Sequence, residues 1–327
     1  MAIHMFQQLI DTLKKSPKKI VFTEGTDARI LEASARLLSG TFLTPVLVGN
    51  PEEIQAAAEE AGFNIRGAEI IDPETYPEMD KMVDTMVELR KGKMTADECR
   101  AALKKSNYFG TMLVKMGVAD CLLGGATYST ADTVRPALQL VKTKPGNKIV
   151  SSCFIMVREG VGENTVLAMG DCAINIKPTE DELVEITTEV AHCARIFGID
   201  PKVAMLSYST KGSGAGENVD KVRHAYEKLM ATDPDFAVDG ELQFDAAISP
   251  KVAETKCKGS PVAGQANTFI FPEIQSGNIG YKIAQRLGNF DAYGPILLGL
   301  NAPINDLSRG CNAMEVYSMA IITAALK

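Results

Sequence analysis

The stretch Lys19–Val48 reads KIVFTEGTDARILEASARLLSGTFLTPVLV, and it predicts a strand, a helix and a second strand in succession. Lys19–Thr23 is a short apolar run of the kind that forms a buried strand. Thr26 or Asp27 can cap the helix that follows, and Pro45–Val48 is again short and apolar. A strand, a crossing helix and another strand are the usual way to join parallel strands of one sheet.

The same alternation continues along the chain and predicts the fold class. Further short apolar runs predict strands at Ala68–Ile71, Asp120–Leu123, Val203–Ser207, Asp245–Ile248, Thr268–Phe271 and, as the last strand, Pro295–Leu300. Helical patterns separate most of them. Two more runs, Ile149–Val157 and Thr165–Met169, have turn residues between them and predict a hairpin. We therefore expect an α/β protein with mainly parallel sheets that helices cover on both faces.

The length of 327 residues suits two domains better than one. With 46% hydrophobic and 23% charged residues, the composition is that of an ordinary globular protein. The turn-rich stretch Lys142–Lys148 (KTKPGNK) is the best candidate for the first crossing between domains.

Charge and cysteine content exclude several functional classes. The formal net charge is −7, and no cluster of lysine and arginine points to nucleic acid or to an anionic membrane surface. The N-terminus does not resemble a signal peptide, and no run approaches the roughly 20 apolar residues of a membrane span. The seven cysteines form neither a C-x-x-C pair nor a zinc pattern. We expect free thiols, no bound metal and a cytoplasmic protein.

Glycine-rich nucleotide loops can be rejected, but one loop keeps a possible role. The chain has no G-x-G-x-x-G and no G-x-x-x-x-G-K-[ST] motif, so NAD and ATP have no support from the sequence. The loop Ser207–Gly216 nevertheless follows a predicted strand and precedes a predicted helix, where ligands bind in open α/β sheets. Its backbone N–H groups can hold an anion. The alternative is a plain Gly/Ser turn.

The run Ser308-Arg309-Gly310-Cys311 lies between the last predicted strand and the terminal helix. Asn312 and Glu315 have the spacing of a capping box. One interpretation of the run is therefore that it is simply a well-capped helix start. The partial positive charge of a helix N-terminus, beside a hydroxyl and a guanidinium, also suits an oxyanion or a phosphate.

Cations near helix ends are the remaining candidates. Lys282 and Arg286 are four residues apart in one predicted helix and share a face, which suits an anion or simply a solvated surface. Arg29, Arg90 and Arg135 are single arginines near helix ends, and surface exposure is the default for each. No arrangement of histidine, serine and acid indicates a hydrolase.

Four segments taken together resemble the phosphate acetyltransferase family across almost the whole chain. They are Ser129–Pro136 (STADTVRP), Ser207–Gly214 (SYSTKGSG), Asn278–Leu287 (NIGYKIAQRL) and Pro303–Cys311 (PINDLSRGC). The resemblance implies two three-layer α/β/α domains with the site in the cleft between them, an architecture related to the isocitrate and isopropylmalate dehydrogenases. The first domain would hold residues 1–146 and 299–327, and the second residues 147–298. A homodimer is also implied.

The resemblance implies the reversible reaction of acetyl-CoA with phosphate to give acetyl phosphate and coenzyme A, with no permanently bound cofactor. It assigns catalysis to Ser308, Arg309 and Glu315, where Glu315 stands in place of the family's aspartate. It assigns the remaining site residues as follows: phosphate to Arg90, Arg135, Ser129 and Thr130, coenzyme A to Arg29, Lys282 and Arg286, and a cleft loop to Ser209, Thr210, Lys211, Gly212 and Ser213.

Three alternatives remain open from the sequence. A phosphate butyryltransferase shares the fold, and pocket volume, which sets the acyl chain length, cannot be read from the sequence. A dehydrogenase on the related scaffold lacks the motif set above and an obvious aspartate cluster for a metal. A non-catalytic module that senses acyl-CoA or acetyl phosphate stays open because Glu315 replaces the family's aspartate.

Overall fold

The computed structural model describes residues 2–160 and 166–327, and the chain forms two compact units. The terminal unit consists of Phe6–Pro145 and Leu300–Lys327. The central unit consists of Gly146–Gly299 together with residues 2–5. The first crossing therefore lies between Pro145 and Gly146.

The terminal unit is built on a five-stranded sheet in the order β11-β4-β1-β2-β3, and every neighbouring pair is parallel. Its strands are β1 (Lys18–Phe22), β2 (Leu43–Val48), β3 (Glu69–Ile71), β4 (Cys121–Gly124) and β11 (Ile304–Asp306). The predicted strand–helix–strand opening is confirmed, because β1 and β2 pair in parallel with α2 between them.

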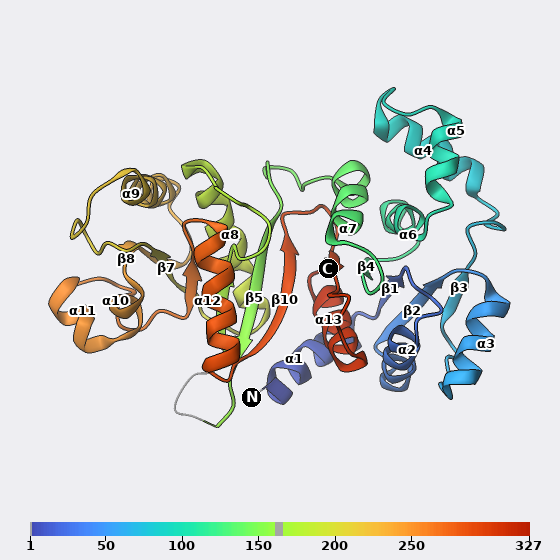
Figure 1. The fold of residues 1–327 in the computed structure, drawn as a ribbon, viewed down its shortest axis with the longest axis horizontal. Coiled ribbons are helices and arrows are strands. Elements are labelled where there is room, and N and C mark those ends of the chain that lie inside the picture. Colours follow the sequence, from blue (N-terminus) through green and yellow to red (C-terminus); the bar gives the residue numbers. More distant parts are fainter. Residues whose placement is uncertain (1, 161–165) are drawn as a thin grey trace. The chain divides into compact units, whose positions relative to one another are not determined.

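Helices cover both faces of this sheet (Figure 1). Val21, Leu122 and Ile304 face a core that α4 and α6 complete, while α2 and α13 pack against each other on the other face. Asp27 is the residue that caps α2, since its side chain accepts a hydrogen bond from the N–H of Arg29. The helices are α1 (Ala2–Lys15), α2 (Ala28–Gly40), α3 (Pro51–Ala61), α4 (Met79–Arg90), α5 (Ala96–Leu103), α6 (Ser106–Lys115), α7 (Thr130–Pro136) and α13 (Ala313–Ala325).

The helical segment Thr130–Val141 is interrupted. It is α-helical only to Pro136, and Ala137–Val141 forms one π-helical turn, η1. Proline has no N–H to continue the α-helical hydrogen bonds, and the N–H of Lys142 reaches back five residues to the carbonyl of Ala137. Ser129 and Asp132 have the spacing of a capping box but form none, because the Ser129 hydroxyl donates to the Asp132 carboxylate at 2.7 Å and caps no backbone N–H.

The central unit is built on a six-stranded mixed sheet in the order β10-β5-β6-β9-β7-β8. Its strands are β5 (Ser151–Val157), β6 (Val166–Gly170), β7 (Lys202–Leu206), β8 (Ala237–Leu242), β9 (Thr268–Ile270) and β10 (Asp291–Leu298). The predicted hairpin is confirmed by the antiparallel pairing of β5 with β6, although Thr165 lies outside the described residues. β10 is antiparallel to β5, and the other pairs are parallel.

One strand prediction in this part of the chain is wrong, and a second places a strand correctly but wrongly makes it the last one. Asp245–Ile248 belongs to a short helix, and its buried residues Ala246 and Ala247 are adjacent instead of alternating as in a strand. Pro295–Leu300 lies largely within β10, which is not the last strand. The last strand is β11, only three residues long and partly polar. The helices of this unit are α8 (Glu180–Ile196), α9 (Glu217–Met230), α10 (Phe244–Ile248), α11 (Pro250–Lys256) and α12 (Ile274–Leu287).

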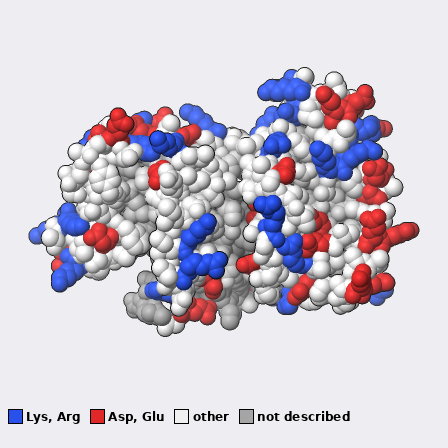
Figure 2. Space-filling view, viewed as in Figure 1, with Lys and Arg blue, Asp and Glu red and all other residues white. Residues whose placement is uncertain are grey.

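The expected α/β class with mainly parallel sheets is confirmed. Figure 2 shows acidic side chains over α3, where Glu52, Glu53, Glu59 and Glu60 are exposed. Across the described residues, no helix is long and apolar enough to span a membrane.

Candidate active site

The exposed tripeptide Ser308-Arg309-Gly310 joins the carboxyl end of β11 to the start of α13. The Ser308 hydroxyl oxygen accepts a hydrogen bond from the N–H of Gly310 at 3.3 Å, so its own proton can be donated outward. In the part of the chain that the structure describes, no hydrogen bond or ion pair engages the Arg309 guanidinium. A hydroxyl and an uncommitted cation therefore lie on adjacent residues shortly before the N-terminus of α13, which suits a developing negative charge.

Glu315 lies in the first turn of α13 and closes the predicted capping box. Its carboxylate accepts a hydrogen bond from the N–H of Asn312 at 2.9 Å, and the Asn312 side chain accepts one from the N–H of Glu315 at 3.0 Å. Glu315 is exposed, so its second carboxylate oxygen can reach a ligand. The capping box is confirmed, and the role of Glu315 as a base stays a prediction.

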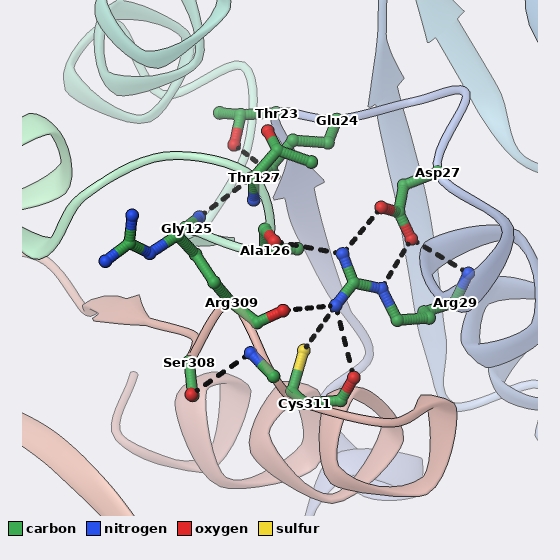
Figure 3. A network of polar contacts seen from close by, with 11 residues as sticks. Thr23, Glu24, Asp27, Arg29, Gly125, Ala126, Thr127, Ser308, Arg309 and Cys311 are labelled. Carbon is green, nitrogen blue, oxygen red and sulfur yellow. Dashed lines mark hydrogen bonds and ion pairs between the residues drawn. The ribbon is translucent and has the colours of Figure 1, made fainter.

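Arg29 is packed against the same loop, as Figure 3 shows. Its Nη1 donates to the carbonyl oxygens of Arg309 at 2.9 Å and Cys311 at 3.2 Å. It also forms an ion pair with Asp27, and its hydrogen bonds lower the pKa of that carboxyl. The resemblance assigned Arg29 to coenzyme A, whereas the structure engages it in contacts within the protein.

Two buried or half-buried carboxyl groups near this loop escaped the sequence analysis. Asp306, at the end of β11, is only 4% exposed and accepts hydrogen bonds from the hydroxyls of Thr130 at 2.6 Å and Thr133 at 2.5 Å. Burial raises its pKa, which the two hydrogen bonds only partly offset. The Thr130 hydroxyl, expected to bind phosphate, is thus donated to Asp306.

Glu24 is the second of these carboxyl groups and follows the carboxyl end of β1. It accepts hydrogen bonds from the hydroxyl of Thr23 at 2.8 Å and from the N–H groups of Gly125 at 2.9 Å and Thr127 at 3.2 Å. Burial raises the pKa of Glu24 despite these bonds. The available signal was its position, since a carboxylate just after a buried parallel strand often lies at a site.

Arg90 and Arg135 lie near the ends of α4 and α7. Arg135 is exposed. The Nε of Arg90 is buried and has no hydrogen-bond partner among the described residues. A buried donor without a partner is costly and is expected to be satisfied by a ligand or by water. This supports Arg90 as an anion contact, and both assignments stay predictions.

The loop Ser209–Ser213 in the central unit uses its donors internally. The hydroxyl of Ser209 and the N–H of Gly212 both donate to the buried carboxylate of Glu241, at 3.0 and 2.7 Å. Lys211 pairs with Asp239 and donates to the carbonyl of Gly240. Thr210 and Ser213 bond to each other through the N–H of Thr210 and the Ser213 hydroxyl at 2.9 Å. These donors hold protein carboxylates and backbone, which favours the plain-turn alternative for the loop itself.

Lys282 and Arg286 are both exposed on α12, as their spacing predicted. The Lys282 ammonium lies 5.9 Å from the ring centroid of Tyr281. Their proposed contact with coenzyme A stays a prediction. In residues 2–160 and 166–327, no group of three or more histidine, cysteine, aspartate or glutamate side chains is placed to hold a metal ion.

Comparisons with known proteins all find similarity to phosphate acetyltransferases or their family. The family model described as phosphate acetyl/butaryl transferase matches residues 4–324. A phosphate acetyltransferase of Bacillus subtilis is 52% identical over 321 residues, which are 98% of each chain, and one of Staphylococcus epidermidis is 49% identical over 97% of each. The crystal structure of a phosphotransacetylase from Streptococcus pyogenes, 53% identical, superposes with a TM-score of 0.97 over 100% of this chain and 98% of that one.

Proposed function

Because the chain belongs to the phosphate acetyl/butaryl transferase family, we propose that it transfers an acetyl group reversibly between coenzyme A and inorganic phosphate. The identity of about half of all residues with acetyltransferases, over nearly their whole length, carries this proposal. The exposed residues Ser308 and Arg309, just before α13, support the proposal because a hydroxyl and a guanidinium there can contact the reacting groups.

The proposed reaction is a direct acyl transfer. The sulfur of coenzyme A attacks the carbonyl carbon of acetyl phosphate and forms a C–S bond. The bond between the carbonyl carbon and the oxygen that bridges to phosphorus breaks, and phosphate leaves with the electron pair of that bond. The thiol proton passes to a base. Cys311 is next to Gly310, but burial raises the pKa of its thiol, so it is poorly suited to act as a protein nucleophile.

Arg309 would stabilise the charge that develops on the carbonyl oxygen. Its guanidinium can turn toward a substrate without breaking any hydrogen bond among the described residues. One such electrostatic donor typically contributes ~10²–10³ in rate. The Ser308 hydroxyl would donate to the same oxygen or to phosphate.

Glu315 would accept the thiol proton through the oxygen that does not cap α13. The capping bond from Asn312 fixes the carboxylate in the first turn of α13, six residues after Arg309. Glutamate has one more methylene than the family's aspartate, and the exposed position of Glu315 leaves room for it.

Arg90 and Arg135 would bind phosphate, and Lys282 and Arg286 would bind the phosphates of coenzyme A. The unpartnered Nε of Arg90 supports the first assignment. A guanidinium can bind phosphate through two parallel hydrogen bonds, which orients it as well as holding it. The exposure of both cations on one face of α12 supports the second.

We also propose a homodimer that works in the cytoplasm with no permanently bound cofactor. Acetyl phosphate is already activated, so the chemistry of transfer asks for no prosthetic group. Size-exclusion chromatography with multi-angle light scattering tests the dimer. Dialysis against a chelator tests the cofactor proposal, because activity should survive it.

The function itself is tested with the pure protein, acetyl-CoA and inorganic phosphate. We expect free thiol to appear only when phosphate is present, together with acetyl phosphate. A parallel assay with butyryl-CoA compares the acyl chains, and we expect the higher kcat/KM with acetyl-CoA. Binding of acetyl-CoA without any phosphate-dependent thiol release would instead indicate a sensing module.

A further inference from the structure

We propose that Arg29 is a positioning residue that holds the backbone of Arg309 and Cys311 in place for catalysis, and that it does not bind coenzyme A. This inference rests on the proposed function, because it assigns Arg29 a role in orienting the Ser308-Arg309 pair. Arg29 is committed to hydrogen bonds within the protein, and these bonds connect three loops.

Every N–H group of the Arg29 guanidinium has an acceptor inside the protein. The group carries five such donors in a planar fork. Nε donates to Asp27 Oδ1 at 2.9 Å, and Nη2 donates to Asp27 Oδ2 at 2.7 Å and to the carbonyl of Ala126 at 2.9 Å. Nη1 donates to the carbonyls of Arg309 and Cys311 at 2.9 and 3.2 Å. A phosphate of coenzyme A would have to displace one of these acceptors.

Asp27 fixes the guanidinium from the other side. Its carboxylate pairs with Arg29 through both oxygens and also caps α2 by accepting from the N–H of Arg29 at 2.9 Å. The two side chains are 27% and 15% exposed, which limits screening of the pair by water. The pair is neutral overall, so it attracts an anionic ligand less than an uncommitted arginine would.

The acceptors come from the carboxyl ends of three neighbouring strands. Asp27 follows β1, Ala126 follows β4, and Arg309 and Cys311 follow β11. These strands are adjacent in the order β11-β4-β1. Arg29 therefore ties together the three loops at this edge of the sheet.

The loop after β4 is held on two sides. Glu24 accepts from the N–H groups of Gly125 and Thr127, while Arg29 donates to the carbonyl of the residue between them, Ala126. The peptide groups that carry the Arg29 contact are thus fixed independently. The Arg309 backbone is bonded to a rigid support, while its guanidinium points away from that of Arg29 (Figure 3).

This arrangement separates two functions of Arg309. Its carbonyl is fixed by Arg29, and its side chain remains available for the substrate. Misplacement of a catalytic group by about 1 Å can cost ~10²-fold in rate. Loss of the Arg29 contacts should therefore lower kcat, whereas loss of a direct ligand contact would raise KM for coenzyme A.

The first experiment compares Arg29→Gln with the wild type, using coenzyme A and dephospho-coenzyme A, which lacks the 3′-phosphate, as thiols. We expect kcat to fall about 10- to 100-fold with both thiols and KM for each to change less than about twofold. A rise of about tenfold in KM for coenzyme A, with kcat retained and little change for the dephospho form, would overturn the proposal.

A double variant tests whether Arg29 acts through Arg309. If it does, Arg29→Gln should have almost no further effect on kcat in an Arg309→Gln background, because the group being positioned is gone. If the fold-losses in kcat of the two single variants multiply in the double variant, the two residues act independently and the proposal is overturned. Arg36→Gln is the matched control, since Arg36 lies on the same helix in an exposed pair with Glu32 and should leave kcat unchanged.

A third readout does not depend on activity. Trypsin can cleave after the exposed Arg309, and the peptide ending there can be quantified by mass spectrometry. We expect Arg29→Gln to speed this cleavage at least about fivefold, because the loop opens more often; an unchanged rate would overturn the proposal. Faster cleavage together with an inactive wild type would disprove the proposed function and leave the Arg29 contact standing.

Folding is checked by circular dichroism and thermal unfolding before each assay. If Arg29→Gln does not fold, the same measurements are made on Arg29→Lys. Lysine keeps the positive charge but lacks the planar set of guanidinium donors. The expected losses are the same for Arg29→Lys. Wild-type kcat and cleavage rate in that folded variant would overturn the proposal.

Discussion

Thr130 and Asp306 are 176 residues apart in the chain, and the hydroxyl of Thr130 donates to the buried carboxylate of Asp306 at 2.6 Å. Thr133, one turn further along α7, donates to the other oxygen. The start of α7 is thereby fixed to the end of β11, two residues before Ser308. The loop that begins at Ser308 thus follows a strand end held by a carboxyl group that the sequence analysis did not select.

Asp306→Asn should change how stability depends on pH. Burial raises the pKa of Asp306 in the folded protein. Such an acid binds more protons folded than unfolded, so stability falls as the pH rises above the unfolded value of about 4. The variant lacks this group. The quantity to compare is the difference in free energy of unfolding, wild type minus variant. We expect this difference to decrease as the pH rises from about 4.

Urea unfolding at a series of pH values measures this difference. A difference that is constant with pH would mean that Asp306 titrates alike in the folded and unfolded states. A difference that increases with pH would contradict the predicted direction.

Gly125→Ala should destabilise the protein by about 3 kcal/mol or more, because two costs combine. Gly125 has a φ of 100°, and an added Cβ would lie 2.3 Å from the Asp306 carboxylate. Gly146→Ala is the matched control, since its φ is 94° but nothing lies within 4 Å of an added Cβ. We expect it to cost about 1 kcal/mol in the same urea unfolding measurement. Equal losses would show that Asp306 moves aside easily.

Glu315→Gln should lower kcat about 10²-fold if Glu315 is the base, with little change in KM for coenzyme A. Glutamine can still accept the capping hydrogen bond from Asn312, so the start of α13 should survive. Asn312→Ala is the complementary variant. It removes the side-chain cap at a cost of about 1 kcal/mol and keeps the carboxylate, so most of kcat should remain. Steady-state kinetics on both variants decide, and wild-type kcat in Glu315→Gln would rule out the base assignment.

Arg90→Gln should raise KM for phosphate about tenfold while KM for acetyl-CoA stays nearly constant, because a charge-assisted hydrogen bond is lost. The buried, unpartnered Nε of Arg90 is the structural reason to expect a ligand there. Arg100→Gln serves as the control, since Arg100 is exposed and paired with Asp80. Initial rates at varied phosphate give the answer. An unchanged KM for phosphate would remove Arg90 from the site.

Features set by neighbours in sequence could be predicted well. The cap of α2 at Asp27 and the capping box of Asn312 and Glu315 each depend on residues within one helical turn. Strand predictions were less secure where the pattern was short. β11 has only three residues, and Asn305 and Asp306 gave it no apolar run.

The site residues show the limit of local reasoning more clearly. Arg29 was recognisable as an arginine near a helix start, but its acceptors at Ala126 and Arg309 lie 97 and 280 residues away. Glu241 likewise satisfies the donors of Ser209 and Gly212 from a different strand. Hydrogen-bond acceptors of this kind depend on sheet order, which the sequence pattern does not specify.

The most direct test of the account is thioester formation from acetyl phosphate and coenzyme A by pure wild type and Arg309→Gln. The Arg309 side chain makes no hydrogen bond among the described residues, so its replacement should leave the fold intact. We predict acetyl-CoA formation by the wild type, and a kcat lower by ~10²–10³ in the variant with KM values little changed. No thioester from the folded wild type, or an unaltered kcat in Arg309→Gln, would contradict it.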